Sequence, residues 1–168
     1  MKNQNVLLQP FTPSDLPLFE SWLEQPFIYK WFCPSGEADK QDWLDEMADI
    51  SESEQINQFV IVLNDQKIGF AQCIDISTVP DYVEEVYSDL TGTLVENQAY
   101  ELSYLIGEES LLGQGLGKMM IQHLVEEVKK RGGRLVLADP GEENTPSVRV
   151  LLSNGFVKFK DGDYRKDL

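Results

Sequence analysis

The sequence predicts a single mixed α/β (α+β) domain over residues 1–168. The chain has 168 residues, of which 42% are apolar and 26% are charged. A chain of this size and composition folds as one globular domain and can bury a core of its own. Segments with the alternating pattern of strands are interleaved with segments that have the 3.6-residue period of helices. A glycine-rich turn at residues 112–117 joins one such strand to a long helix.

The first third of the chain is expected to be mainly helical. Residues 6–8 form a short apolar strand, and residues 12–15 (TPSD) place a proline where a helix begins. Apolar residues at helical spacing continue to Leu23. The segment 26–34 is crowded with aromatic residues and bounded by prolines, so we expect it to be too short and too broken for a regular helix. A second, acidic helix is expected at residues 39–50.

Strands are expected in the middle of the chain. Residues 59–63 and 68–71, separated by a short polar turn, are typical of a hairpin. Residues 77–98 are acidic and irregular. Because strands resume directly after them, we expect an excursion that flanks the active site rather than a linker. Residues 100–106 form the next strand and lead into the glycine-rich turn.

The last third alternates between helix and strand. Residues 116–131 have the apolar spacing of a long helix, which ends in basic residues followed by glycines, the usual stop signal. Residues 134–138 form a strand. A further helix begins with a Thr-Pro pair and closes with Asn-Gly at residues 145–155, and strands at 156–159 and 164–166 are expected to form a final hairpin.

The charge balance excludes several classes of protein. Lys and Arg together number 14 and Asp and Glu together number 29, which gives a net charge of −15. This charge repels nucleic-acid phosphates and favours cationic small molecules or basic proteins as partners. The single histidine, His123, lies inside a predicted helix, which argues against a Ser-His-Asp hydrolase. The chain also has too few nitrogen and sulfur ligands for a dedicated zinc site, so no metal is expected.

The cysteines and the hydropathy pattern indicate the location of the protein. Cys33 and Cys73 cannot form a disulfide framework and are expected to be buried apolar side chains, so a reducing cytoplasm is expected. The sequence has no apolar run of transmembrane length and no signal-peptide core near residue 1, so no membrane association is expected. A monomer or a homodimer is expected.

The turn after residues 100–106 is the most informative stretch. Gly113, Gly115 and Gly117 occupy alternate positions at the start of a helix. Glycines allow a close approach of the backbone to a ligand, and the free N–H groups of a helix N-terminus bind phosphate oxygens. Lys118 adds a positive charge nearby. The alternative is a tight connection between strand and helix, and neither common nucleotide-binding glycine motif fits.

The order of these elements resembles the Gcn5-related N-acetyltransferase (GNAT) superfamily. The likeness includes the turn 112–117, the strand 135–138, Asn144 and the sequence Asn-Gly-Phe at 154–156. Leu112 departs from the usual Arg or Gln at the first position of the turn. The same departure at this position is found in the branch that contains aminoglycoside 6′-N-acetyltransferases, so the chain resembles that branch. The resemblance implies a central, mixed, mostly antiparallel sheet with splayed strands, flanked by helices.

The resemblance also implies that acetyl-CoA is the co-substrate. In this family, backbone N–H groups of the glycine turn hold the pyrophosphate, and the main chain of the preceding strand binds the pantetheine arm. The implied cofactor-binding residues are Leu105, Ile106, Gly107, Gly113, Gln114, Gly115, Leu116, Gly117, Lys118 and Asn144. Asn144 has an alternative role, because with the following Thr-Pro pair it can simply begin a helix.

The candidate catalytic residues are Glu101 and Ser103, which the strand period places on one face, opposite Tyr100, Leu102 and Tyr104. Members of the aminoglycoside branch often have an aspartate where this chain has Ser103. Glu101 resembles the base glutamate of histone-type members, with an ordinary solvated residue as the alternative. Many members place a thiol-protonating tyrosine where this chain has Leu151. Proton delivery is therefore expected from water or from a tyrosine elsewhere.

The predicted function is acetyl-CoA-dependent transfer of an acetyl group to a primary amine of a cationic small molecule, such as an aminoglycoside or a polyamine. Tyr29, Trp31, Tyr82 and Glu84 are predicted to bind this acceptor, because carboxylates and aromatic ring faces attract amines. Two alternatives remain open. One is acetylation of a protein N-terminus or lysine side chain, and the other is a non-catalytic module that binds acetyl-CoA.

Overall fold

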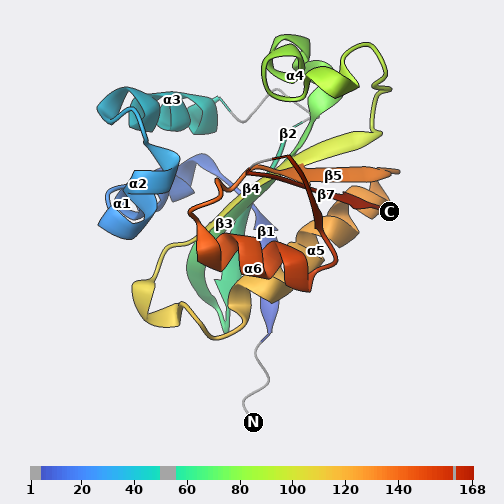
Figure 1. The fold of residues 1–168 in the computed structure, drawn as a ribbon. Coiled ribbons are helices and arrows are strands. Elements are labelled where there is room, and N and C mark those ends of the chain that lie inside the picture. The colour runs from blue at the N-terminus through green and yellow to red at the C-terminus, as the bar shows by residue number, and fades with distance from the viewer. Residues whose placement is uncertain (1–4, 50–55, 161) are drawn as a thin grey trace.

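The computed structural model describes residues 5–49, 56–160 and 162–168. Within these residues, seven strands form one sheet in the order β1-β2-β3-β4-β5-β7-β6 (Figure 1). The strands are β1 (Val6–Pro10), β2 (Ile56–Leu63), β3 (Gln66–Asp75), β4 (Ala99–Ile106), β5 (Leu135–Ala138), β6 (Val157–Lys160) and β7 (Asp163–Asp167). Only β4 and β5 pair in parallel in this part of the chain. The expected mixed, mostly antiparallel sheet is therefore confirmed.

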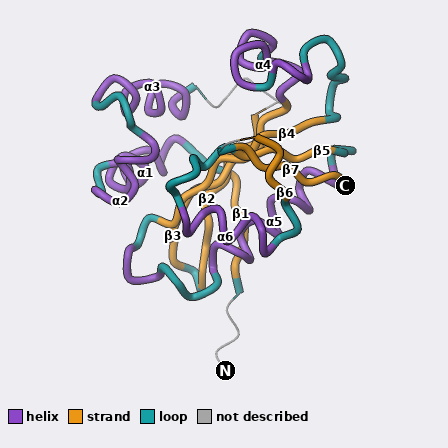
Figure 2. Tube along the Cα trace, viewed as in Figure 1, coloured by secondary structure: helices purple, strands orange, loops and turns teal. Residues whose placement is uncertain are grey.

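Helices cover both faces of the sheet. They are α1 (Leu16–Leu23), α2 (Pro26–Phe32), α3 (Glu37–Ala48), α4 (Pro80–Val86), α5 (Leu116–Lys130) and α6 (Thr145–Ser153). Side chains of β2 alternate between the faces: Ile61 packs in the cluster with α5 and α6, while Val60 packs in the cluster with α1 and α3. Figure 2 shows the same division, with α1, α2 and α3 together on one side and α5 beside α6. The core therefore has two layers of apolar packing with the sheet between them.

Strands β4 and β5 diverge near the middle of the sheet. They pair in parallel only from Ala99 to Glu101, opposite 135–137. Strand β4 continues to Ile106, paired with β3 on its other edge, whereas β5 ends at Ala138. Within the described residues, the edge of β4 from 102 to 106 that faces β5 therefore has no strand against it. The divergence opens a notch in the sheet at this level.

Two segments that were expected to be irregular contain helices. Residues 26–32 form α2, because Pro26 occupies the first helical position and does not interrupt the helix. In the same way Pro80 begins α4 inside the acidic segment 77–98, and Val83 and Tyr87 of that segment pack in a small core. The expectation of a broken segment at 26–34 was therefore wrong, and the acidic segment 77–98 is more regular than expected. Helix α3 begins at Glu37, and its expected end at residue 50 lies outside the described residues.

Both cysteines are buried and free of disulfides. Burial raises the pKa of the Cys73 thiol to about 11, so this group is an inert packing residue at neutral pH. The described residues contain no cluster of His, Cys, Asp and Glu that could hold a metal ion. Among the helices of the described chain, none has the length and apolar character needed to span a bilayer.

Candidate active site

The glycine turn at the start of α5 is open on its outer side. Gly113 and Gly115 have positive φ angles of 74° and 80°, a conformation that favours glycine. A Cβ atom built on either residue meets nothing within 4 Å. Gly115 caps α5, whose first N–H groups have no partner within the helix. The turn therefore presents backbone N–H donors and the positive end of a helix to an accessible space.

Other residues near this turn have visible packing roles. A Cβ on Gly117 would lie 3.3 Å from Val150 of α6, so this glycine permits the close approach of the two helices. A Cβ on Gly107 would lie 2.2 Å from the Trp22 ring, and the Gly107 N–H already donates to the Ile68 carbonyl. Gln114 Nε2 donates to the Ser110 carbonyl at 2.9 Å and so braces the turn.

Around the turn, Leu116 is buried in the main core, whereas Lys118 is exposed. Lys118 therefore remains available as the nearby positive charge that the sequence predicted.

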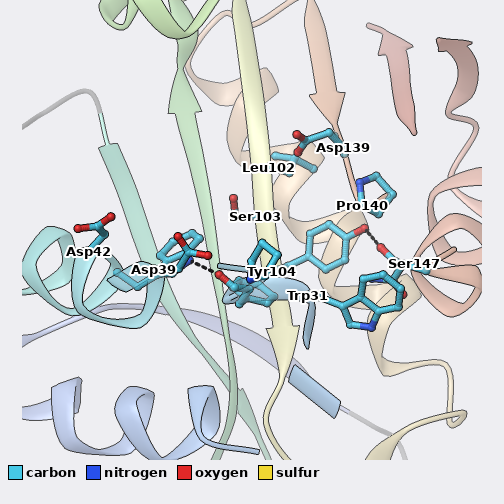
Figure 3. A pocket seen from close by; sticks show the side chains of 14 residues that line it. Trp31, Asp39, Asp42, Leu102, Ser103, Tyr104, Asp139, Pro140 and Ser147 are labelled. Carbon is cyan, nitrogen blue, oxygen red and sulfur yellow. Dashed lines mark hydrogen bonds between the residues drawn. The ribbon is translucent and has the colours of Figure 1, made fainter. Parts of the chain in front are cut away.

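A cavity of about 390 Å³ lies where β4 and β5 diverge (Figure 3). Its residues come from α2 and the turn after it, from α3, from β4, from the end of β5 and the segment after it, and from the start of α6. They are Trp31, Phe32, Pro34, Asp39, Asp42, Trp43, Leu102, Ser103, Tyr104, Ala138, Asp139, Pro140, Asn144 and Ser147. We call it the first cavity. It combines two indole rings with three carboxylates, which is a suitable lining for a cation.

A second cavity of about 430 Å³ adjoins the first. Its lining residues are Trp43, Glu46, Gln72, Ile74, Ile76, Val79, Tyr82, Glu101, Ser103 and Asp139. Trp43, Ser103 and Asp139 line both cavities, so these three side chains stand at the boundary between them. Ser103 therefore lies between the space lined by Glu101 and the space lined by Asn144.

Glu101 is a buried carboxylate with two tyrosine partners. Its exposed fraction is 7%, which rules out a solvated strand residue. The Tyr82 hydroxyl donates to its two oxygens at 2.9 and 3.0 Å, and the Tyr87 hydroxyl donates at 2.5 Å. Burial, followed by the charge of Asp139, raises the pKa of Glu101 to about 7, although the two tyrosine hydrogen bonds oppose this shift. Near neutral pH this carboxylate can both accept and release a proton.

Asp139 is the second perturbed carboxyl of the site. Burial, followed by the charge of Asp163, raises its pKa to about 6. It follows β5 directly and lines both cavities. The carboxyls of Glu101 and Asp139 repel each other when both are ionised, and a cation placed between them would relieve that repulsion.

Asn144 and Ser147 of α6 face the first cavity. Asn144 stands at the N-cap of α6, but its side chain makes no capping hydrogen bond. Asn144 therefore begins the helix, as the alternative expected, while its side-chain amide remains free of a capping bond. The Ser147 hydroxyl is hydrogen-bonded to the Tyr104 hydroxyl across the notch (Figure 3). Leu151, one turn further along α6, is fully buried in the core.

The four residues predicted to bind the acceptor lie in different places. Trp31 lines the first cavity, and Tyr82 lines the second, where it donates to Glu101. Tyr29 lies outside the lining of both cavities and donates to Glu37 at 2.9 Å. Glu84 is exposed on α4, also outside both linings. The structure thus brings Trp31 and Tyr82 to the candidate site and leaves the other two away from it.

Sequence reasoning gave no role to several residues of this site, among them Trp43, Tyr87 and Asp139. Asp139 follows a buried strand at its carboxyl end, a position where functional side chains gather in parallel pairs, so a signal was present. Trp43 lies within the helix expected at residues 39–50, where an apolar side chain is typical of ordinary core packing. Tyr87 gave no signal, because its contact with Glu101 joins residues 14 positions apart through a segment expected to be irregular.

Residues 12–164 match the family model described as acetyltransferase (GNAT) domain. The chain therefore belongs to the GNAT family, and it is an N-acetyltransferase by class. The resemblance inferred from the glycine turn is confirmed.

Individual relatives and solved structures are similar to this chain over nearly its whole length. The chain is 26% identical over 172 residues to aminoglycoside N(6')-acetyltransferase type 1 of Klebsiella pneumoniae, with 93% of this chain and 76% of the relative covered. A solved aminoglycoside acetyltransferase in complex with coenzyme A and kanamycin has a TM-score of 0.79 at 21% identity, covering 97% of this chain and 95% of that chain. A domain from Methanocaldococcus jannaschii has a TM-score of 0.73 at 22% identity, covering 99% and 100%. These two structural likenesses establish the shared fold.

Proposed function

We propose that this protein transfers the acetyl group of acetyl-CoA to a primary amine of a cationic small molecule, of the aminoglycoside or polyamine kind. The observation that carries the proposal is the first cavity. At the divergence of β4 and β5, it brings residues of β4 and of the start of α6 together with carboxylates and indole rings. A donor and a cationic acceptor could therefore meet at one place.

The residues around the notch fit acetyl-CoA. The open turn at Gly113 and Gly115 and the start of α5 suit a pyrophosphate, which backbone N–H groups of residues 114–118 would hold. Neighbouring residues of a strand direct their main-chain groups to opposite edges, and the Leu105 carbonyl faces β3, where a Cβ on Gly69 would lie 2.3 Å from it. The edge of β4 that faces β5 therefore leaves the main-chain groups of Ile106 for the amides of a pantetheine arm. Asn144 would contact the same arm from α6. The solved relative in complex with coenzyme A supports acetyl-CoA as the co-substrate.

The acceptor side of the proposal rests on charge and aromatic surface. Asp39, Asp42 and Asp139 line the first cavity together with the rings of Trp31 and Trp43. Ammonium groups bind carboxylates through charge-assisted hydrogen bonds and bind indole faces through cation–π attraction. The relative from Klebsiella pneumoniae is named for aminoglycoside acetylation, which agrees with a polycationic acceptor.

Glu101 is the proposed general base. An amine attacks a carbonyl only when it is neutral, and it must lose a proton as the new C–N bond forms. Glu101 lines the second cavity and not the first, whereas Ser103 lines both. The proton would therefore pass from the amine through the Ser103 hydroxyl or a water molecule to the Glu101 carboxylate. Bound acetyl-CoA supplies the activated acyl group, and the chain supplies position and proton acceptance.

Two measurements test the proposed function. Calorimetry should show that coenzyme A binds, and at a hundredfold excess over its dissociation constant it should stabilise the fold by about 2.7 kcal/mol. Release of free thiol from acetyl-CoA should then be measured with aminoglycosides, polyamines and basic peptides. Turnover with the first two groups is expected. Turnover with peptides alone would favour a protein acetyltransferase, and binding without any turnover would favour a non-catalytic module.

A further inference from the structure

We propose that Tyr104, supported by Ser147, donates the proton to the thiolate that leaves acetyl-CoA. The inference rests on the proposed function. It assigns a catalytic role to a strand tyrosine, because α6 offers no acid of its own at the position where the sequence resemblance expects one.

Helix α6 lacks an acid at Leu151, and a hydroxyl pair reaches the same helix from another position. Leu151 is fully buried and has no proton to give. Ser147 lies four residues earlier, and residues spaced by four share one face of a helix. The Tyr104 hydroxyl is hydrogen-bonded to the Ser147 hydroxyl, so a phenol from β4 reaches that same face of α6. Tyr104 and Ser147 line the first cavity (Figure 3), and Asn144 lines it as well.

The position along β4 also places Tyr104 beside the sulfur. On the proposed function, pantetheine binds the main chain of Ile106 at the free edge of β4, and the acceptor amine approaches the level of Ser103. The thioester must span the interval between them, at about 3.3 Å per residue of strand. Tyr104 lies in that interval and lines the first cavity. Its ring points toward α6, on the opposite side of β4 from Glu101. Acid and base therefore approach the reacting group from opposite faces.

The proton balance of the step closes. The amine nitrogen forms the C–N bond, and its proton goes through Ser103 or water to Glu101. The C–S bond breaks, its electron pair stays on sulfur, and the proton of the Tyr104 hydroxyl moves to sulfur to give free coenzyme A. The half-buried Ser147 hydroxyl passes a proton to the phenolic oxygen, and water restores Ser147. Glu101 later returns its proton to solvent.

The environment of Tyr104 favours proton transfer from Tyr104 to sulfur and from Ser147 to Tyr104 in one concerted step. Burial raises the pKa of the Tyr104 hydroxyl, and the Ser147 hydrogen bond partly opposes that shift. The phenol therefore stays protonated at the pH of the reaction, and a free tyrosinate is costly. Simultaneous donation from Ser147 avoids the tyrosinate. Loss of either hydroxyl is expected to slow the departure of the thiol.

A binding experiment without turnover tests the contact with sulfur. Calorimetry would compare coenzyme A with desulfo-coenzyme A, which lacks the sulfur atom, on the wild type and on Tyr104→Phe. The variant should bind coenzyme A about 2- to 10-fold more weakly, the value of one hydrogen bond, and should bind the desulfo analogue with unchanged affinity. An equal loss for both ligands would show that Tyr104 only supports the structure, and would overturn the proposal.

Turnover provides the second readout. Tyr104→Phe should lower kcat by about 10²- to 10⁴-fold with little change in either KM, and Ser147→Ala should lower it less. The matched control is Tyr100→Phe, which removes a partly buried hydroxyl from the same face of β4, where its partner is Asn97. That variant should keep wild-type kcat. If Tyr104→Phe stays within about threefold of wild-type kcat, the proposal fails. A wild type that binds no coenzyme A would instead refute the proposed function itself.

Discussion

Glu101 lies at a strand position that is otherwise suited to an apolar residue, and its environment balances opposite effects on its pKa. Burial and the negative charge of Asp139 raise the pKa, whereas hydroxyl donors from Tyr82 and Tyr87 lower it. The outcome is a pKa of about 7, close to the value at which a general base works best in neutral solution. The tyrosines thus hold the carboxylate in place and keep it ionisable.

Replacement of Glu101 by Gln tests the base directly. The variant keeps the shape of the side chain and can no longer take a proton. Turnover at neutral pH should fall by about 10²- to 10⁴-fold and recover at high pH, where the amine deprotonates without help. Affinity for coenzyme A should be nearly unchanged. Glu85→Gln, which alters an exposed carboxylate on α4, is the matched control. Near-normal turnover of Glu101→Gln at neutral pH would show that Glu101 has a structural role.

The tyrosine contacts predict a shift in the pH profile. A base is active when deprotonated, so kcat/KM should rise with pH through the Glu101 pKa of about 7. Tyr87→Phe removes a hydrogen bond that lowers this pKa, so the midpoint of the rise should move to higher pH. The measurement is kcat/KM as a function of pH for both proteins. An unmoved midpoint would mean that another group controls the rise.

Some residues of the site could be predicted from the sequence and others could not. The glycine turn could be predicted, because its backbone N–H donors follow one another at 113–118 and depend only on the start of one helix. The environment of Glu101 is not local, because Tyr82, Tyr87 and Asp139 reach it from α4, the segment after α4 and the end of β5. Strand alternation correctly placed Glu101 and Ser103 on one face. Only packing could show that this face is buried against α4.

At the scale of elements, periodic segments were predicted well and short proline-led helices were not. The long apolar stripe of α5 gave that helix to within one residue at its end. Helices α2 and α4 each have seven residues and begin with proline. In such short segments, propensity alone is a weak guide, and the aromatic packing around Phe32 and Tyr87 stabilises the helices. That packing involves side chains far away in the sequence.

The start of α5 yields a prediction about the donor site. Gly115→Val should abolish binding of coenzyme A, because a branched side chain would fill the open space over the turn. The positive φ angle of Gly115 adds a strain of about 1–2 kcal/mol that must be separated from this effect. Gly132→Val is the matched control, since Gly132 has a φ of 84°, equally open surroundings and a place at the far end of α5. Both variants should lose similar stability, and only Gly115→Val should lose calorimetric binding.

At the scale of the whole molecule, the net charge of −15 predicts how the acceptor is captured. Long-range attraction between this charge and a polycation is screened by salt, with a Debye length of about 8 Å at physiological ionic strength. The KM for multiply charged amines should therefore rise several-fold between low and high salt. The KM for a singly charged amine should change much less. Steady-state kinetics at a series of salt concentrations would check this, and equal salt dependence for both acceptors would contradict it.

The divergence of β4 and β5 also gives the two halves of the sheet different resistance to local unfolding. Three residue pairs, between 99–101 and 135–137, are the parallel contact that joins β5, β7 and β6 to the rest of the described sheet. Such a narrow seam should let the C-terminal strands open as a unit at lower free energy than β2 and β3. A ligand lying across the notch would hold the two halves together. Hydrogen exchange should therefore show β5 amides less protected than β3 amides in the free protein, and a selective gain for β5 with coenzyme A. Glu101 belongs to this seam. Each opening would therefore displace the proposed proton acceptor, and bound acetyl-CoA would keep Glu101 in place for the reaction in which acetyl-CoA is used.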